Sequence, residues 1–198
     1  MTSKSRPDSV TGGCLCGAIR YTIHFPADAE WPPSHNATCQ CTQCRKTTGS
    51  LLPQLLEIPL SHVTPDLTPT YDAAALPSYR LYRSSSRACR GFCTACGSSL
   101  TWIDAERPET IEVHVGTLDE EVLIGRLVES KEEERDEYGV RQKREGGWGR
   151  ELGKARWHNF VENAVPGVTD RMEGPKHLRI GLEGEKSFGG GLEDVGRG

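Results

Sequence analysis

The cysteines constrain this chain of 198 residues more than any other feature, because seven of the eight lie in three short clusters. The clusters are Cys14 and Cys16, then Cys39, Cys41 and Cys44, then Cys93 and Cys96. Thiolates one or two residues apart can converge on one metal ion, whereas cysteines this close in sequence rarely have the separation that a disulfide needs. A closed zinc site takes four ligands and a reactive one keeps a position open. Seven thiolates therefore divide into one complete site and one three-thiolate site.

The start of the chain and its charge favour metal binding over disulfides and argue against several classes of protein. Residues 1–9 are polar and have no apolar signal-peptide core. We therefore expect a reducing compartment, the cytoplasm or also the nucleus, where structural disulfides are rare. No apolar run approaches the ~18 residues that span a bilayer, so a membrane protein is not expected. The formal net charge of −4 argues against a nucleic-acid partner.

The pattern of charge and glycine predicts one folded domain over residues 10–180. Residues 1–9 and 181–198 are expected to be disordered tails, the second because its glycine and charge leave little apolar surface to bury. Residues 129–147 form a charged insertion with almost no apolar periodicity. We interpret that insertion as a solvated helix or a mobile segment in preference to a dedicated interaction segment.

Most of the domain is predicted to form short β-strands. These segments alternate apolar and polar residues or are rich in β-branched and aromatic ones: 18–25, 51–58, 79–82, 87–92, 98–103 and 110–116. Pro53 confines the second segment to a sheet edge or a bend. The two strands that flank Cys93 and Cys96 place this cluster at the tip of a hairpin.

The first and third clusters have the form of zinc knuckles. Glycine follows the last cysteine of each, Gly17 after Cys16 and Gly97 after Cys96. Glycine accepts the positive φ of a backbone that turns its N–H groups toward sulfur. Two such knuckles that face each other would build a four-thiolate site.

The middle cluster is predicted to differ, because a short helix ended by Gly49 follows it. Cys41 and Cys44 would share one face of that helix while Cys39 reaches in from the preceding strand. Three sulfurs then surround an ion from one side and leave its fourth position to water or substrate. The alternative is a closed site whose fourth ligand comes from elsewhere in the chain: Cys89, His24, His35, His62 or His114.

Four segments form an ordered pattern: residues 11–21 (TGGCLCGAIRY), 39–49 (CQCTQCRKTTG), 90–97 (RGFCTACG) and 115–119 (VGTLD). Together they resemble the glutathione-dependent formaldehyde-activating enzyme family, whose domain also occurs in centromere protein V, over about residues 10–130. The resemblance implies a mainly β fold, a β-tent of small stacked antiparallel sheets with few short helices. It implies a structural zinc on Cys14, Cys16, Cys93 and Cys96, and a second zinc on Cys39, Cys41 and Cys44 at which glutathione and carbon–sulfur chemistry are located.

We therefore predict a zinc-dependent carbon–sulfur lyase-type enzyme with two zinc ions. Its substrate would be an adduct of glutathione, or another small thiol, with formaldehyde or a related carbonyl. A thiol bound at the three-thiolate site would ionise and attack the carbonyl carbon. Arg45, next to Cys44, is the predicted contact for a glutathione carboxylate. The alternative hypothesis is a zinc-stabilised binding module without turnover.

Overall fold

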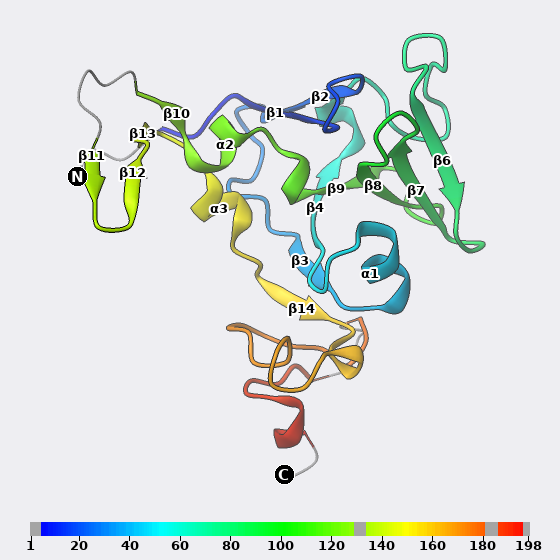
Figure 1. Ribbon diagram of the computed structural model, residues 1–198. Helices are drawn as coiled ribbons and strands as arrows, with labels where there is room; N and C mark the ends of the chain where they lie inside the picture. Colours follow the sequence, from blue (N-terminus) through cyan, green and yellow to red (C-terminus); the bar gives the residue numbers. More distant parts are fainter. Residues whose placement is uncertain (1–4, 129–133, 181–185, 196–198) are drawn as a thin grey trace.

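The computed structural model describes residues 5–128, 134–180 and 186–195, and its architecture is mainly β, with several sheets and few short helices (Figure 1). The largest sheet has seven strands in the order β14-β3-β4-β9-β8-β7-β6. Neighbours in this sheet are antiparallel except for β14 and β3, which are parallel. In chain order the strands are β3 (Asn36–Cys39), β4 (Gln54–Pro59), β6 (Tyr79–Arg83), β7 (Ala88–Cys93), β8 (Ser99–Asp104), β9 (Thr110–His114) and β14 (Trp157–Asn159).

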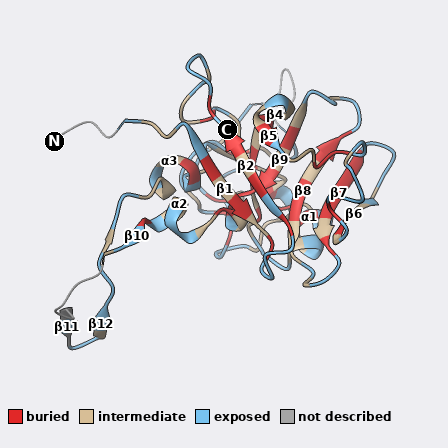
Figure 2. Ribbon diagram, turned by 90° about the horizontal axis from the view of Figure 1, so that it is seen from above, coloured by how far each residue is buried: buried red, intermediate tan, exposed pale blue. Residues whose placement is uncertain are grey.

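A three-stranded sheet packs against this sheet to form the main core. It consists of β1 (Ser9–Gly13), β2 (Arg20–His24) and β5 (Val63–Thr64). Alternate residues of β2 point into the core: Tyr21 is 2% exposed and Ile23 is fully buried. They join Leu56, Leu100 and other apolar side chains of the large sheet in one cluster. Each fully buried leucine or isoleucine contributes roughly 1.5–3 kcal/mol, so this cluster holds the two sheets together. Buried residues are concentrated in these strands (Figure 2).

The helices are short and lie at the ends of the strands. They are α1 (Thr42–Thr48), α2 (Glu120–Ile124) and α3 (Gly149–Gly153), with single 3₁₀ turns η1 (Leu60–His62), η2 (Val115–Thr117), η3 (Val161–Asn163) and η4 (Leu192–Asp194). Within the described residues, none of the helices has both the length and the apolar character that crossing a membrane requires. Because α1 directly follows β3, it carries the middle cysteine cluster at one end of the large sheet.

The predicted charged insertion contains strands where the structure describes it. β11 (Glu134–Asp136) and β12 (Gly139–Arg141) form a hairpin that projects from the rest of the chain (Figure 1). β13 (Arg144–Glu145), inside the predicted insertion, pairs with β10 (Arg126–Leu127), which lies just before it. The helical interpretation is therefore wrong over residues 134–147, and residues 129–133 lie outside the described part of the chain. Charged residues of both signs with few apolar side chains give no periodic signal from which this hairpin could be predicted.

The predicted tails are described only in part. Residues 1–4, 181–185 and 196–198 lie outside the described ranges. Residues 9–13 form β1, and within the C-terminal segment Phe188 exchanges two backbone hydrogen bonds with Lys176. The predicted limits of the domain, 10 and 180, stay a prediction. Of the two positions predicted for Pro53, a sheet edge or a bend, the structure has the bend: Pro53 precedes β4, and β4 lies inside the sheet between β3 and β9.

Candidate metal centres and the adjoining cavity

The four cysteines of the two predicted knuckles come together in space. The sulfurs of Cys14, Cys16, Cys93 and Cys96 all lie within 4.8 Å of one another. Cys14 precedes β2, and Cys93 ends β7 at the hairpin turn that leads to β8, as the sequence predicts. Gly17 and Gly97 have φ values of 76° and 77°, in the region that glycine alone enters without strain. The predicted knuckle geometry is therefore present at both ends of this cluster.

The environment of this cluster suits a structural metal. Cys14 and Cys93 belong to the main apolar core, with exposed fractions of 6% and 0%. The backbone N–H of Ile19 donates to Sγ of Cys14 at 3.2 Å. The Ser98 hydroxyl, 3.2 Å from Sγ of Cys96, and nearby backbone N–H groups lower the pKa of that thiol to about 5. Four convergent thiols with N–H donors to sulfur are the donor set of a closed zinc site.

The three cysteines of the middle cluster also converge, within 4.8 Å of one another. Cys39 ends β3, Cys41 caps the N-terminus of α1, and Cys44 lies in its first turn. The Cys44 N–H donates to Sγ of Cys41 at 3.3 Å, and α1 ends at Gly49 with φ 69°. The strand before Cys39, a short helix and its end at Gly49 were predicted from the sequence, whereas the cap by Cys41 was not. Among the described residues, no histidine, carboxylate or further cysteine joins this group.

Contacts among these three thiols shift their pKa values in opposite directions. The thiols of Cys39 and Cys44 donate to Cys41, which holds the pKa of Cys41 well below its usual value and leaves the pKa of Cys39 raised. The charge of Arg90 acts in the same direction on Cys41. A divalent cation that bound the three sulfurs would displace their protons.

The alternative fourth ligands do not approach the middle cluster. Cys89 is 5% exposed and packs in the main core with residues of the other sheet. His114 is buried on β9, where Ser99 Oγ is 3.4 Å from its Nε2. Burial lowers the pKa of His114 to about 4, so this imidazole is neutral at pH 7. His35 lies next to two carboxylates instead, with its ligand atom within 4.8 Å of Glu57 and Glu112.

A cavity of about 480 Å³ opens beside the middle cluster. All three of its cysteines line the cavity, and none of the four knuckle cysteines does. Apolar and aromatic lining comes from Leu55, Trp102 and Phe160, and polar lining includes Arg87, Arg90, Asp104, Arg107 and Glu112. The cavity has the size and mixed lining typical of a small-molecule site.

Arg90 is the cation in closest contact with the cysteines. It lies on β7, is 4% exposed, and places Nη1 3.5 Å from Sγ of Cys44. Its other donors reach Gln43 Oε1 at 3.3 Å and Ser84 Oγ at 3.1 Å. Arg90 forms no ion pair with a carboxylate among the described residues, so its charge acts on the thiol cluster.

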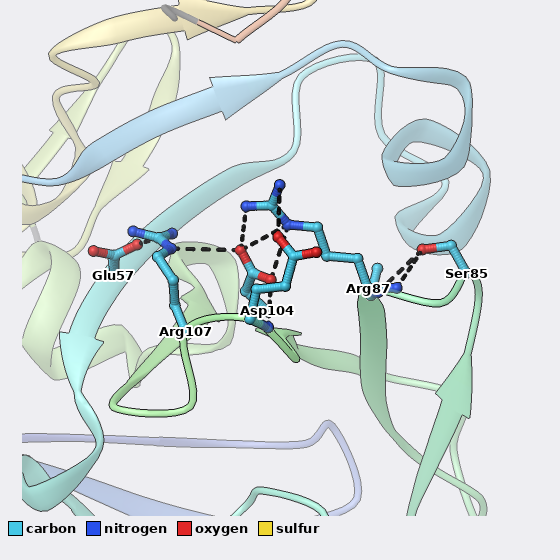
Figure 3. A network of polar contacts seen from close by, with 7 residues as sticks. Glu57, Ser85, Arg87, Asp104 and Arg107 are labelled. Atoms are coloured by element: carbon cyan, nitrogen blue, oxygen red, sulfur yellow. Dashed lines mark hydrogen bonds and ion pairs between the residues drawn. The ribbon is translucent and has the colours of Figure 1, made fainter.

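The other two arginines of the cavity belong to a network of alternating charges (Figure 3). Arg87 Nε donates to both carboxylate oxygens of Asp104 at 2.9 Å. Arg107 lies between two acids, with Nη2 2.6 Å from Glu57 Oε2 and Nε 3.4 Å from Asp104 Oδ2. The Arg87 guanidinium is the main cause of a lowered pKa at Asp104. The network therefore fixes the wall of the cavity with paired charges.

Sequence reasoning placed the cysteines but missed part of the cavity. Arg45 lies on α1, outside the residues that line the cavity, and its Nε is buried without a hydrogen-bond partner in the described structure. Its predicted role in glutathione binding stays a prediction. Glu112 and Trp102 were missed. The apolar–polar alternation of residues 110–116 carried a signal for Glu112, since it puts this residue on the face of β9 opposite the core.

The sequence matches a known protein family. Residues 9–130 match the family model described as glutathione-dependent formaldehyde-activating enzyme. Among curated proteins, no sequence matches this chain. A crystal structure of a Rhodobacter sphaeroides protein is similar over 56% of this chain and 88% of that one, with 22% sequence identity and a TM-score of 0.41. Because the family model covers more than half of the sequence, the chain belongs to the glutathione-dependent formaldehyde-activating enzyme family.

Proposed function

We propose that this protein is a zinc-dependent carbon–sulfur lyase-type enzyme that acts on the adduct of glutathione, or a closely related thiol, with formaldehyde or another small carbonyl. The observation that carries this proposal is the opening of Cys39, Cys41 and Cys44 onto a cavity. No fourth ligand joins these cysteines from the described residues. Reactive metal sites keep such a position for a substrate.

The donor set of this centre fits zinc. Three thiolates held by a strand and a helix N-terminus are soft ligands, which zinc accepts in tetrahedral geometry. When bound there, zinc would lower the pKa of an external thiol and would hold its sulfur in the cavity. The second ion of the proposal, at the two knuckles, would be structural. The cytoplasm is the compartment that this chemistry fits, because thiols stay reduced there.

The lining of the cavity suits an anionic peptide thiol. Glutathione has two carboxylates, and the lining includes three arginines. Two of these are held by carboxylates, whereas Arg90 is free of such a pair within the described structure. Trp102 and Phe160 supply apolar surface that excludes water from a reacting carbonyl. Arg45, on α1 next to Cys44, remains our proposed outer contact for one carboxylate.

X-ray absorption at the zinc edge, with and without glutathione, tests the proposal. Two zinc ions per chain are expected, and glutathione should raise the mean number of sulfur ligands because only the middle cluster can accept a fourth. S-Methylglutathione serves as the control, since it keeps the peptide and has no ionisable thiol. An Arg45→Ala variant should keep both zinc ions and bind glutathione about 1–2 kcal/mol more weakly. A sulfur count that does not change with glutathione would contradict the proposal.

The alternative function is a zinc-stabilised binding module without turnover. Thiols add to formaldehyde spontaneously, so the decisive measurement is exchange at equilibrium between glutathione and its formaldehyde adduct. Magnetisation-transfer NMR measures that exchange with and without the protein. Acceleration that disappears in Cys41→Ser supports the enzyme. Exchange at the uncatalysed rate, with glutathione bound, would favour the binding module.

A further inference from the structure

Four neighbouring strands place a row of four side chains on one face of the large sheet, and three of these side chains line the cavity. On neighbouring antiparallel strands, residues directly opposite each other point to the same face of a sheet. The register pairs Glu57 with Glu112, Glu112 with Trp102, and Trp102 with Arg90. Arg90 at the end of this row contacts Cys44. Glu112 therefore lies two strands from Arg90, about 10 Å away at the usual strand spacing, in the cavity that the thiol cluster shares.

The two glutamates of this row cannot both be ionised without cost. A carboxylate oxygen of Glu57 and one of Glu112 lie within 4.8 Å of each other. Two carboxylates at such a distance tend to share one proton, because like charges repel strongly away from bulk water. Glu57 accepts a 2.6 Å hydrogen bond from Arg107, which stabilises its ionised form. Glu112 makes no hydrogen bond or ion pair with any described residue. Of the two carboxyl groups, Glu112 is therefore the one that carries the shared proton.

The other charged groups around Glu112 do not change the conclusion that Glu112 is protonated. Burial is the largest effect and Glu57 the next, and together they raise the pKa of Glu112 to about 8. The groups that face it from neighbouring segments are Glu57 on β4, Asp104 on β8, Arg90 on β7, Arg107 after β8 and His35 before β3. The two arginines oppose the shift and are themselves occupied by Glu57, Asp104 and Cys44. Burial also lowers the pKa of His35, which leaves that imidazole neutral.

We propose that Glu112 is the general acid of the reaction, donating its carboxyl proton to the carbonyl oxygen as the thiolate sulfur attacks the carbonyl carbon. This role rests on the proposed function. In the addition, the S–C bond forms, the π bond of the carbonyl breaks, and the oxygen takes the proton of Glu112 to give the hydroxymethyl thioether. The proton lost when the thiol ionised goes to solvent, and Glu112 is reprotonated from solvent. In the reverse direction the Glu112 carboxylate removes the hydroxyl proton as the C–S bond breaks.

Glu112 is suited to this task because a general acid works best with a pKa near the pH of the reaction. An ordinary exposed glutamate, with a pKa of about 4.3, would be ionised and could donate nothing at pH 7. Glu112 reaches the cavity from the face of β9 that carries no core residue. Arg107 forms ion pairs with both Glu57 and Asp104 (Figure 3). These contacts hold the negative charge of Glu57 in place beside Glu112.

The test uses zinc-loaded full-length protein and three variants. Glu112→Gln keeps the shape and removes the acid, Glu112→Asp keeps a carboxyl, and Glu109→Gln removes an exposed glutamate near the start of the same strand as a matched control. Zinc content and thermal melting establish that each variant is folded. Equilibrium exchange of glutathione with its formaldehyde adduct is then measured from about pH 6 to 10, together with the infrared band of a protonated carboxyl over the same range.

We expect Glu112→Gln to lose about 100-fold in the catalysed exchange rate, the low end for general acid catalysis. The wild-type rate of adduct formation should fall above about pH 8, as Glu112 loses its proton, and this fall should be absent from Glu112→Gln. Glu112→Asp should recover part of the rate, and Glu109→Gln should match the wild type. The infrared band should be present at pH 7 in the wild type and missing from Glu112→Gln.

Three results would overturn the assignment, each in a different way. If Glu112→Gln keeps the rate and its pH dependence while Cys41→Ser loses activity, the acid role is wrong and the proposed function stands. If wild-type protein does not accelerate exchange at all, the proposed function fails and the acid role falls with it. An infrared titration that finds Glu112 ionised at pH 7 would also overturn the acid role, independently of activity.

Discussion

The guanidinium of Arg90 lies 3.5 Å from the sulfur of Cys44, two residues 46 positions apart in the sequence. Arg90 is 4% exposed and pairs with no carboxylate among the described residues. A buried cation of this kind needs a negative partner, and the thiolate cluster is the group that Arg90 contacts. Zinc with three thiolates would carry a net charge of about −1, which Arg90 neutralises.

Replacing Arg90 should weaken the second metal site specifically. Because the positive charge lowers the pKa of Cys41 and Cys44, Arg90→Gln should leave these thiols protonated to a higher pH and make protons stronger competitors of zinc. Residues that contact metal ligands typically change metal affinity by about 10–100-fold. Zinc retention against a chelator, measured across pH, checks this. Arg83→Gln, an exposed change at the end of the neighbouring strand, should have no effect.

The two cysteine clusters should differ in what they contribute to stability. Cys14→Ser should unfold or aggregate the protein, since a structural zinc contributes on the order of 10 kcal/mol and a whole domain is stable by only about 5–15. Cys41→Ser should remain folded with one zinc ion, because its side chain lines the cavity and does not belong to the main core. Metal analysis and thermal melting compare the two. Equal loss of stability would contradict the division into structural and reactive sites.

Glutathione should release about one proton to solvent when it binds at pH 7. The thiol ionises as its sulfur enters the open position, and its pKa in solution is about 8.5. S-Methylglutathione should bind more weakly and release none. Calorimetry in two buffers of different ionisation enthalpy counts the proton. Equal affinity for both compounds, without proton release, would remove the thiol-activation mechanism.

Cys89 should be dispensable for metal binding. It is buried in the main core and belongs to neither cysteine cluster. Cys89→Ala should retain two zinc ions and cost about 1–2 kcal/mol of stability, as expected for a small buried side chain. Loss of one zinc equivalent would identify Cys89 as a ligand that closes the second site.

His114 should make stability fall as the solution becomes acidic. Its pKa is lowered to about 4 by burial, against about 6.5 in the unfolded chain. A histidine with a lowered folded pKa contributes stability that is fully present above about pH 6.5 and is lost as pH falls toward 4. The contribution is about 3 kcal/mol. His114→Gln should flatten this part of the pH profile, measured by denaturant unfolding with zinc in excess over the range in which the metal stays bound.

The local features of both centres could be predicted from the sequence because local rules determine them. The hairpin tip at Cys93 and Cys96, the short helix that ends at Gly49, and the positive φ of Gly17 each follow from spacing and residue type. The mainly β fold followed from alternation and from the family resemblance. These parts of the structure depend on residues close together in the chain.

The cavity could not be predicted, because long-range register decides which side chains enter it. Arg90 was one of several cations near the clusters, and nothing in the sequence distinguished it from Arg45. Only the pairing of β7 with β8 places Arg90 opposite Trp102 on the cavity face. The closeness of Glu112 and Glu57 likewise depends on the register of β9 against β4. The hairpin β11–β12 escaped prediction because its sequence is rich in charged residues and shows no alternation of apolar and polar residues.

The parallel pairing of β14 with β3 has a consequence for how this protein can diverge. The pairing sets Asn159 opposite Cys39, and Asn159, Phe160 and Ile180 line the cavity. These three residues lie beyond residues 9–130, the part of the chain that contains every cysteine of both centres. Mutations after residue 130 can therefore reshape the cavity while the ligand set is inherited unchanged. Homologues with the same seven thiols can in this way differ in the shape and lining of the cavity.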